Sequence, residues 1–213
     1  MRRITIDPIT RLEGHGKIVI FLNDDGEVEN CYFQVPELRG FEQFCVGRPV
    51  EEMPRITTRI CGVCPEAHHM ASTKACDAVF QAEPPGAAKK LRELLYSAFY
   101  VGDHTLHFYA LGGPDFVVGP DAPPGERNIL GVVGKVGLAA GQKVIELRKR
   151  AQRVVALIGG KAIHPVTGLP GGLAKPITAE ERDEIIGHAA HFVEFAKFTL
   201  GVLEQIVLAN QAY

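Results

Sequence analysis

Three long segments with the helical spacing of apolar residues make up most of the chain after residue 86. They cover residues 87–111, residues 132–158 and about 30 residues from Thr178, and breaks rich in Gly and Pro separate them. Apolar residues that recur every three or four positions turn one face of a helix toward a core. Helices of this length bury such faces against one another, so the sequence predicts a bundle of long helices.

The last of these segments stays apolar to its end. Thr178 and Glu181 form the pattern of a capping box at its start, and residues 202–208 are still rich in Val, Leu and Ile. A helix this apolar needs partners on more than one side. We therefore expect residues 39–213 to form a helical bundle that is incomplete without further protein.

The first 38 residues follow a different pattern. Residues 17–22 are a β-branched run, residues 23–26 read Asn-Asp-Asp-Gly, and residues 27–35 alternate imperfectly. This combination is typical of a β-hairpin, and residues 4–7 are a candidate third strand. The predicted fold class is α+β, with a small β-hairpin region over residues 1–38 packed on the helical bundle.

Composition excludes several classes of function. Of the 213 residues, 46% are hydrophobic and 23% are charged, which is typical of a folded protein, and the formal net charge of −2 gives no footprint for nucleic acid. No apolar run reaches the roughly 18 residues of a membrane span, and no apolar stretch of signal length follows Met1. We therefore expect a soluble chain with no direct membrane span, which a partner could still attach to a membrane or carry through export.

The cysteine count favours thiols over disulfides. The chain has five cysteines, an odd number in a sequence that is long for a disulfide scaffold. A reducing compartment fits this pattern. Three of the five, Cys31, Cys45 and Cys76, are single residues in apolar surroundings, and we expect them to be small buried core residues.

The chemistry of the sequence is concentrated between Arg59 and His68, a segment that reads RICGVCPEAH. Cys61 and Cys64 can bind one metal, because the turn between them brings both sulfurs to one side, and Gly62 allows that turn. Pro65 should open a helix that runs to about residue 81. Cys64 then lies at the helix N-cap, where the dipole favours a thiolate, and His68 follows one turn later on the same face.

Spacing alone leaves four interpretations of the cysteine pair open. A zinc ribbon needs a second pair of ligands, which only histidines could supply: His68, His69, His104 and His107. A thioredoxin-like redox pair needs a βαβ context that is absent. A structural pair of buried thiols does not need the flanking Arg, Gly and His. The fourth is a soft-metal site completed by cysteines from elsewhere.

A family resemblance favours the fourth interpretation. The segment Arg59-x-Cys61-Gly62-x-Cys64-x-x-x-His68 resembles the proximal metal-binding motif of nickel–iron hydrogenase large subunits. Three further blocks resemble stretches of the same subunits in order and spacing: residues 7–16 (DPITRLEGHG), residues 39–42 (RGFE), and residues 163–165 with 168–172 (IHP and GLPGG). The likeness is closer to cytoplasmic, cofactor- or heterodisulfide-linked hydrogenases than to exported ones.

The resemblance implies a role for individual residues. Cys61 would be a terminal thiolate on nickel, and Cys64 would bridge nickel to an iron that carries cyanide and carbon monoxide. His68 would donate to the bridging sulfur. Glu13 matches a proton-relay glutamate, and Glu42 matches a magnesium ligand.

Arg59 adds positive charge near the metals, so Glu13, His68 and Arg59 are the expected catalytic residues. On sequence alone, Glu13 is otherwise a surface carboxylate at a strand end. Glu42 is otherwise an acid favoured by a helix N-terminus.

The resemblance also implies partners. The family carries a second Cys-x-x-Cys near the end of a chain about twice as long, whereas no cysteine follows Cys76 here. We therefore expect a further segment or another chain to bring that pair, and the remaining alternative is a degenerate paralogue without it. An iron–sulfur small subunit should accept the electrons, because this chain has no cysteine set for a cluster, and further electron-transfer subunits should follow. The expected activity is reversible splitting of dihydrogen. The alternatives are a non-catalytic structural homologue in a respiratory-type complex and a zinc-binding module.

Overall fold

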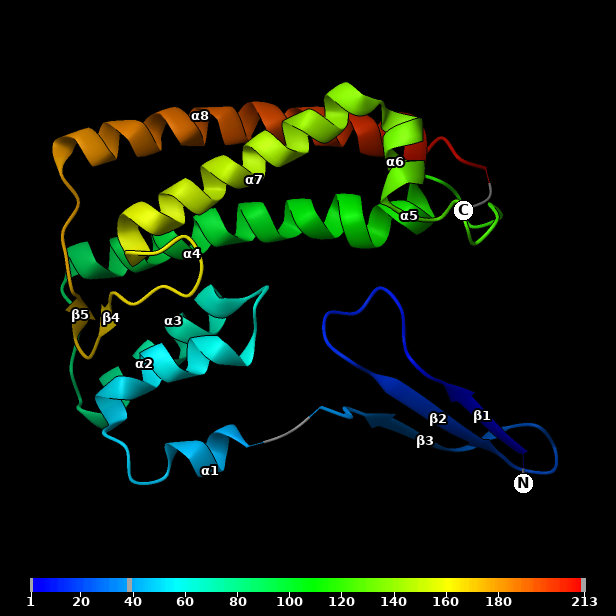
Figure 1. Cartoon of the computed structure of the whole chain (residues 1–213), viewed down its shortest axis with the longest axis horizontal. Coiled ribbons are helices and arrows are strands. Elements are labelled where there is room, and N and C mark those ends of the chain that lie inside the picture. Colours follow the sequence, from blue (N-terminus) through cyan, green and yellow to red (C-terminus); the bar gives the residue numbers. More distant parts are fainter. Residues whose placement is uncertain (1, 38–39, 212–213) are drawn as a thin grey trace. The chain divides into compact units, whose positions relative to one another are not determined.

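The computed structural model describes residues 2–37 and 40–211 (Figure 1). These residues form two compact units, Met1–Phe44 and Cys45–Tyr213, each of which is described by itself. The expected boundary between residues 38 and 39 lies outside the described residues, as does Arg39 of the second matched block.

The first unit is built on an antiparallel sheet in the order β1-β2-β3. Its strands are β1 (Arg2–Ile6), β2 (Lys17–Leu22) and β3 (Val28–Gln34), and the short helix α1 (Phe41–Cys45) follows. Asn23 holds the turn before β3, because its Oδ1 accepts hydrogen bonds from the backbone N–H groups of Asp25 and Glu27. The predicted hairpin and third strand are confirmed.

The second unit consists mainly of helices. Three long ones, α4 (Gly86–Leu106), α7 (Leu138–Gly159) and α8 (Ala179–Val202), correspond to the three periodic segments. The shorter α3 (Pro65–Val79) carries the cysteine motif at its start. The remaining elements are η1 (Val50–Glu52), α2 (Met53–Ile56), η2 (Thr57–Ile60), η3 (His107–Gly112), α5 (Gly113–Phe116), α6 (Ile129–Val136), β4 (Gly168–Leu169), β5 (Gly172–Leu173) and η4 (Leu203–Val207).

Helix α7 packs between α4 and α8, as Figure 1 shows. Leu95 of α4 and Ile158 of α7 lie in one hydrophobic cluster that also includes Met70 of α3 and Ile185 of α8. A second cluster holds Leu147 of α7 with residues from η3, α6, α8 and η4. The predicted α+β class with a bundle of long helices is confirmed. In the described part of the chain, no helix combines the length and the apolarity needed to cross a bilayer.

Two details differ from the sequence prediction. The segment predicted as one helix over residues 132–158 is divided into α6 and α7, because Gly137 between them has φ +87°, a conformation that interrupts a right-handed helix. The helical segment also begins at Ile129 rather than at residue 132, because Asn128 caps α6 by accepting hydrogen bonds from the N–H groups of Leu130 and Gly131. The capping box at Thr178 and Glu181 is present as predicted.

The prediction of three buried single cysteines is correct only for Cys76, which is 1% exposed on α3. Cys31 is exposed and Cys45 is half-buried. Cys31 lies on β3, an edge strand whose residues are all exposed. An apolar sequence context therefore did not imply burial there.

Candidate metal centre

Cys61 and Cys64 lie between two helical segments of the second unit. Cys61 follows η2 with an extended backbone and is buried, whereas Cys64 is the N-cap of α3 and is half-buried. The backbone N–H groups of Val63 and Cys64 point at the Cys61 sulfur from 3.4 and 3.1 Å. These two contacts orient the sulfur toward the start of α3.

His68 completes a compact group with the two cysteines. The Sγ atoms of Cys61 and Cys64 and a ring nitrogen of His68 all lie within 4.8 Å of one another. Donors on one tetrahedral metal, at about 2.0–2.3 Å from it, lie about 3.5–3.8 Å apart, so small side-chain shifts would let all three bind. Thiolate and imidazole donors suit nickel, iron or zinc. The residues present therefore fit a transition metal.

The group holds three ligands rather than four. His69, His104 and His107 were the other candidates for a zinc ribbon, and within the described residues none of them joins the group. His69 is turned away into the protein, with 0% of its surface exposed. A closed structural zinc site, which uses four protein ligands, is thus incomplete in the part of the chain that the structure describes.

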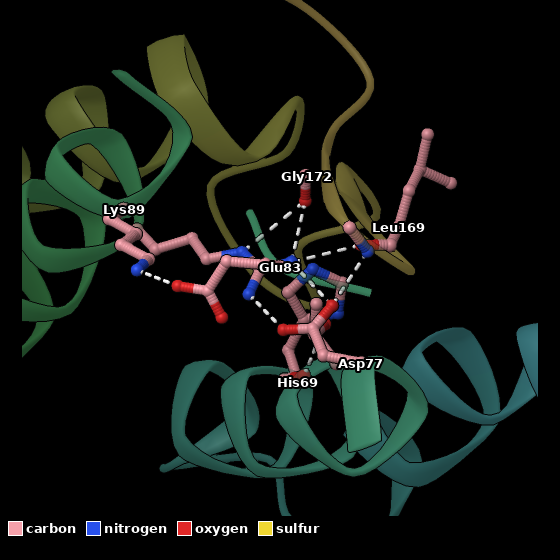
Figure 2. A network of polar contacts seen from close by, with 9 residues as sticks. His69, Asp77, Glu83, Lys89, Leu169 and Gly172 are labelled. Atoms are coloured by element: carbon pink, nitrogen blue, oxygen red, sulfur yellow. Dashed lines mark hydrogen bonds and ion pairs between the residues drawn. The ribbon is translucent and has the colours of Figure 1, made fainter. Parts of the chain in front are cut away.

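His69 lies in a buried polar network that Figure 2 shows. Its Nε2 accepts a hydrogen bond from the Gly168 N–H at 2.9 Å, so the proton is on Nδ1, which donates to the Pro54 carbonyl at 2.8 Å. Burial lowers the pKa of His69 below its ordinary value. Because Nε2 accepts a hydrogen bond, the ring is in its neutral form, and it joins α2, α3 and β4.

The second part of the network is an ion pair between α3 and α4. Arg92 binds both carboxylate oxygens of Asp77, with Nη1 at 2.5 Å from Oδ2, and donates to the carbonyls of Leu169 and Gly172. The side chains of Arg92 and Asp77 are only 7% and 12% exposed. The hydrogen bond from Arg92 lowers the pKa of Asp77. Lys89 and Glu83 form an exposed pair beside it (Figure 2).

Glu66 is a buried carboxyl group in the first turn of α3. It is 6% exposed, and burial raises its pKa, with the negative charge of Asp103 adding to the effect. A cavity of about 290 Å³ lies beside it, and Gly62, Val63 and Asp103 also line this cavity. The turn that carries the two cysteines therefore borders a partly open cavity, and one residue that lines this cavity is an acid with a raised pKa.

The other predicted site residues are exposed in the units that contain them. Arg59 is exposed on η2, two residues before Cys61. Glu13 and Glu42 are exposed residues of the first unit, Glu42 in the first turn of α1. The structure thus brings together Cys61, Cys64 and His68, while the roles of Glu13, Glu42 and Arg59 stay predictions.

The structural roles of His69, Asp77, Arg92 and Glu66 were not predicted from the sequence. The last of these was visible only as a member of the cysteine motif. The residues next to Asp77 and Arg92 in sequence do not reveal their hydrogen-bond partners, which are 15 or more residues away. A charged residue on the apolar face of a predicted helix was the one clue available.

Comparison with known proteins agrees with the site. A family model described as nickel-dependent hydrogenase matches residues 39–122, which include the cysteine cluster, and one described as HoxL-like matches residues 3–38. An iron-sulfur subunit of an F420-non-reducing hydrogenase from Archaeoglobus profundus is 52% identical over 99% of this chain and 43% of its own length. A vhu subunit of the F420-non-reducing hydrogenase of Methanocaldococcus jannaschii is 52% identical over 100% of this chain and 50% of its own.

Solved structures agree as well. An NAD⁺-reducing [NiFe]-hydrogenase in the H2-reduced state superposes with a TM-score of 0.85 at 35% identity, over 98% of this chain and 46% of that one. The Ni-Fe-Se hydrogenase from D. vulgaris Hildenborough gives a TM-score of 0.79 at 33% identity, over 96% and 44%. The chain spans about half the length of the relatives it matches. It belongs to the nickel-dependent hydrogenase large-subunit family, of which it represents the N-terminal half.

Proposed function

We propose that this chain supplies the first half of the large subunit of a nickel–iron hydrogenase that splits dihydrogen reversibly into protons and electrons. The observation that carries the proposal is the cluster of Cys61, Cys64 and His68 at the start of α3, in a chain of this family. When bound, a nickel–iron centre with cyanide and carbon monoxide on the iron would polarise dihydrogen so that a base can remove a proton.

The residues of this chain would hold the metals and move the proton. Cys61 would be a terminal thiolate on nickel, and Cys64 would bridge nickel and iron. His68, which lies within 4.8 Å of both sulfurs, would donate a hydrogen bond to the Cys64 sulfur.

Charged side chains would assist this centre. Arg59 would add positive charge near the thiolates. The carboxylate of Glu13 would accept the released proton, and a carboxylate oxygen of Glu42 would bind magnesium, a hard cation that prefers oxygen.

Further protein has to complete the site. A three-ligand group leaves room for a second Cys-x-x-Cys from another chain or segment. Helix α8 exposes an apolar row at spacing seven, Ile186, Val193 and Leu200, which supports a covering partner along this helix. The five cysteines include no set for an iron–sulfur cluster, so electrons would leave through the clusters of an iron–sulfur small subunit, with further electron-transfer subunits after it. We propose that this assembly works in the cytoplasm.

Cys64→Ser tests the proposal in the complex purified with its partner subunits. We expect nickel content, measured by plasma mass spectrometry, and hydrogen-dependent dye reduction to fall at least about a hundredfold, because one hydroxyl cannot replace a bridging thiolate. Cys31→Ser is the matched control, since Cys31 is exposed on β3. Zinc alone in the wild-type complex would support a zinc module, and a complex without metal would support a structural homologue. Normal turnover in Cys64→Ser would refute the assignment.

A further inference from the structure

The loop between α7 and β5 contacts both chain segments that flank the cysteine pair. His164 Nδ1 donates to the carbonyl of Thr58, three residues before Cys61, at 2.9 Å. The Gly168 N–H donates to His69, five residues after Cys64, at 2.9 Å. This loop, which is distant in sequence, therefore forms hydrogen bonds with residues before Cys61 and after Cys64.

His69 also joins these two segments to each other. Its Nδ1 donates to the carbonyl of Pro54, which lies in α2 ahead of the cysteines. Thr57 adds a second link, because its Oγ1 donates to the carbonyl of Met53 and lies 3.4 Å from that of His68. The start of α3 and the segment that leads to Cys61 thus share one set of buried and partly buried hydrogen bonds.

Only glycine fits at position 168. A Cβ there would lie 2.2 Å from the Thr73 Oγ1 and 2.7 Å from the His69 Nε2. Two residues on from Leu169, the Gly171 N–H donates to Asp77, and Arg92 holds the carbonyls of Leu169 and Gly172 (Figure 2). Residues 168–172 are therefore held by α3 through His69 and Asp77 and by α4 through Arg92.

We propose that His69, anchored by the N–H of Gly168, is a positioning residue that fixes the distance between the Cys61 and Cys64 sulfurs before a metal binds. This inference rests on the proposed metal role of the two thiols. Cys61 follows a short 3₁₀ turn and Cys64 begins a helix, so the two sulfurs are carried by separate elements. Binding one metal between separate elements requires them to be ordered, and a preformed arrangement avoids that cost.

Cobalt(II) is a suitable probe, because thiolate ligation gives it a charge-transfer absorption that can be titrated in the full 213-residue chain. His69→Phe removes both polar contacts of the ring, and Gly168→Ala forces the loop away from it. We expect each to weaken cobalt binding about tenfold or more, the range found when groups that orient metal ligands are lost. His69→Gln should stay closer to wild type, since its amide oxygen can still accept from the Gly168 N–H.

Three matched controls separate positioning from general damage. His104→Phe changes an exposed histidine of α4, and Gly187→Ala adds a Cβ that meets nothing within 4 Å. Thr178→Ala removes the cap of α8 and lowers stability far from the cysteines in sequence. All three should bind cobalt as the wild type does.

Circular dichroism shows which variants fold. If His69→Phe does not fold, the other two variants test the proposal. Gly168→Ala must then bind cobalt weakly, and His69→Gln must bind it nearly as the wild type does. Folded His69→Phe or Gly168→Ala chains with wild-type affinity would overturn it, as would equal losses in the controls. Hydrogen turnover of the wild-type complex is measured separately. Its absence would contradict the proposed function but leave the cobalt result for His69 unaffected.

Discussion

Replacing Arg92 by Met should destabilise the helical unit far more than the loss of an ordinary surface arginine. The substitution keeps the apolar stem and removes the guanidinium, which bonds Asp77 and the carbonyls of Leu169 and Gly172. The Asp77 carboxylate then remains charged in a site where it is only 12% exposed. Breaking a buried ion pair by removing one partner costs about 3–5 kcal/mol.

The cavity beside Asp77 and Arg92 places the expected loss of unfolding free energy at the lower end of that range. A cavity of about 730 Å³ borders Asp77 and Arg92, so water can reach the stranded carboxylate and the two carbonyls. Water that hydrates these groups recovers part of their lost hydrogen bonding. We therefore expect Arg92→Met to lower the free energy of unfolding by about 3 kcal/mol.

Urea unfolding of the chain, followed by helical ellipticity, measures this effect. The matched control is Arg153→Met, which breaks an exposed pair with Glu184 in which the two side chains are 52% and 36% exposed. An exposed pair contributes far less to stability than a buried one, because water screens the two charges. Hydrogen exchange of the Gly171 amide, which donates to Asp77, reports the local opening.

A double variant tests the physical reason. Asp77→Asn removes the charge, so Arg92→Met combined with Asp77→Asn should be less destabilised than Arg92→Met alone, by about 1–2 kcal/mol. If Arg92→Met costs no more than Arg153→Met, the pair is not effectively buried. If the double variant is no more stable than Arg92→Met, the stranded charge is not the cause.

Two further predictions concern protons. Because the pKa of Asp77 is lowered in the folded state, its carboxylate stabilises the protein above the ordinary carboxyl pKa, and this contribution is lost as pH falls through the folded-state pKa. The difference in unfolding free energy between wild type and Asp77→Asn, measured by urea titration, should therefore narrow below about pH 4. A difference that widens there would contradict the direction of the pKa shift. Glu13→Gln in the assembled complex should leave nickel and iron content unchanged but slow hydrogen–deuterium exchange about a hundredfold or more, because an amide cannot accept the proton. Glu27→Gln, at an exposed position before β3, is its control, and unchanged exchange in Glu13→Gln would remove Glu13 from the proton path.

Much of the candidate site could be predicted because its parts are close in sequence. Cys64 and His68 are four residues apart at the helix start that Pro65 marks, so the helix places them on one face. Only the structure shows that Cys61, which follows η2, turns its sulfur toward these two residues, where the N–H groups of Val63 and Cys64 contact it. Glu13 and Glu42 could be named only by resemblance, since nothing in their local pattern distinguishes them from surface acids.

The sequence by itself determined the elements whose causes are local. Periodicity marked the long helices, Asn23 and Gly26 marked the hairpin turn, and Thr178 with Glu181 marked the start of α8. These features depend on contacts within a few residues, which any reader of the sequence can count.

Only the tertiary structure decided which distant segments meet. His69 bonds Gly168 across 99 positions, and Arg92 reaches Gly172 across 80. Gly137 is compatible with a continuous helix in the sequence, but in the structure its positive φ divides the segment into α6 and α7. Such choices depend on burying apolar faces and satisfying buried polar groups together, which no local pattern encodes.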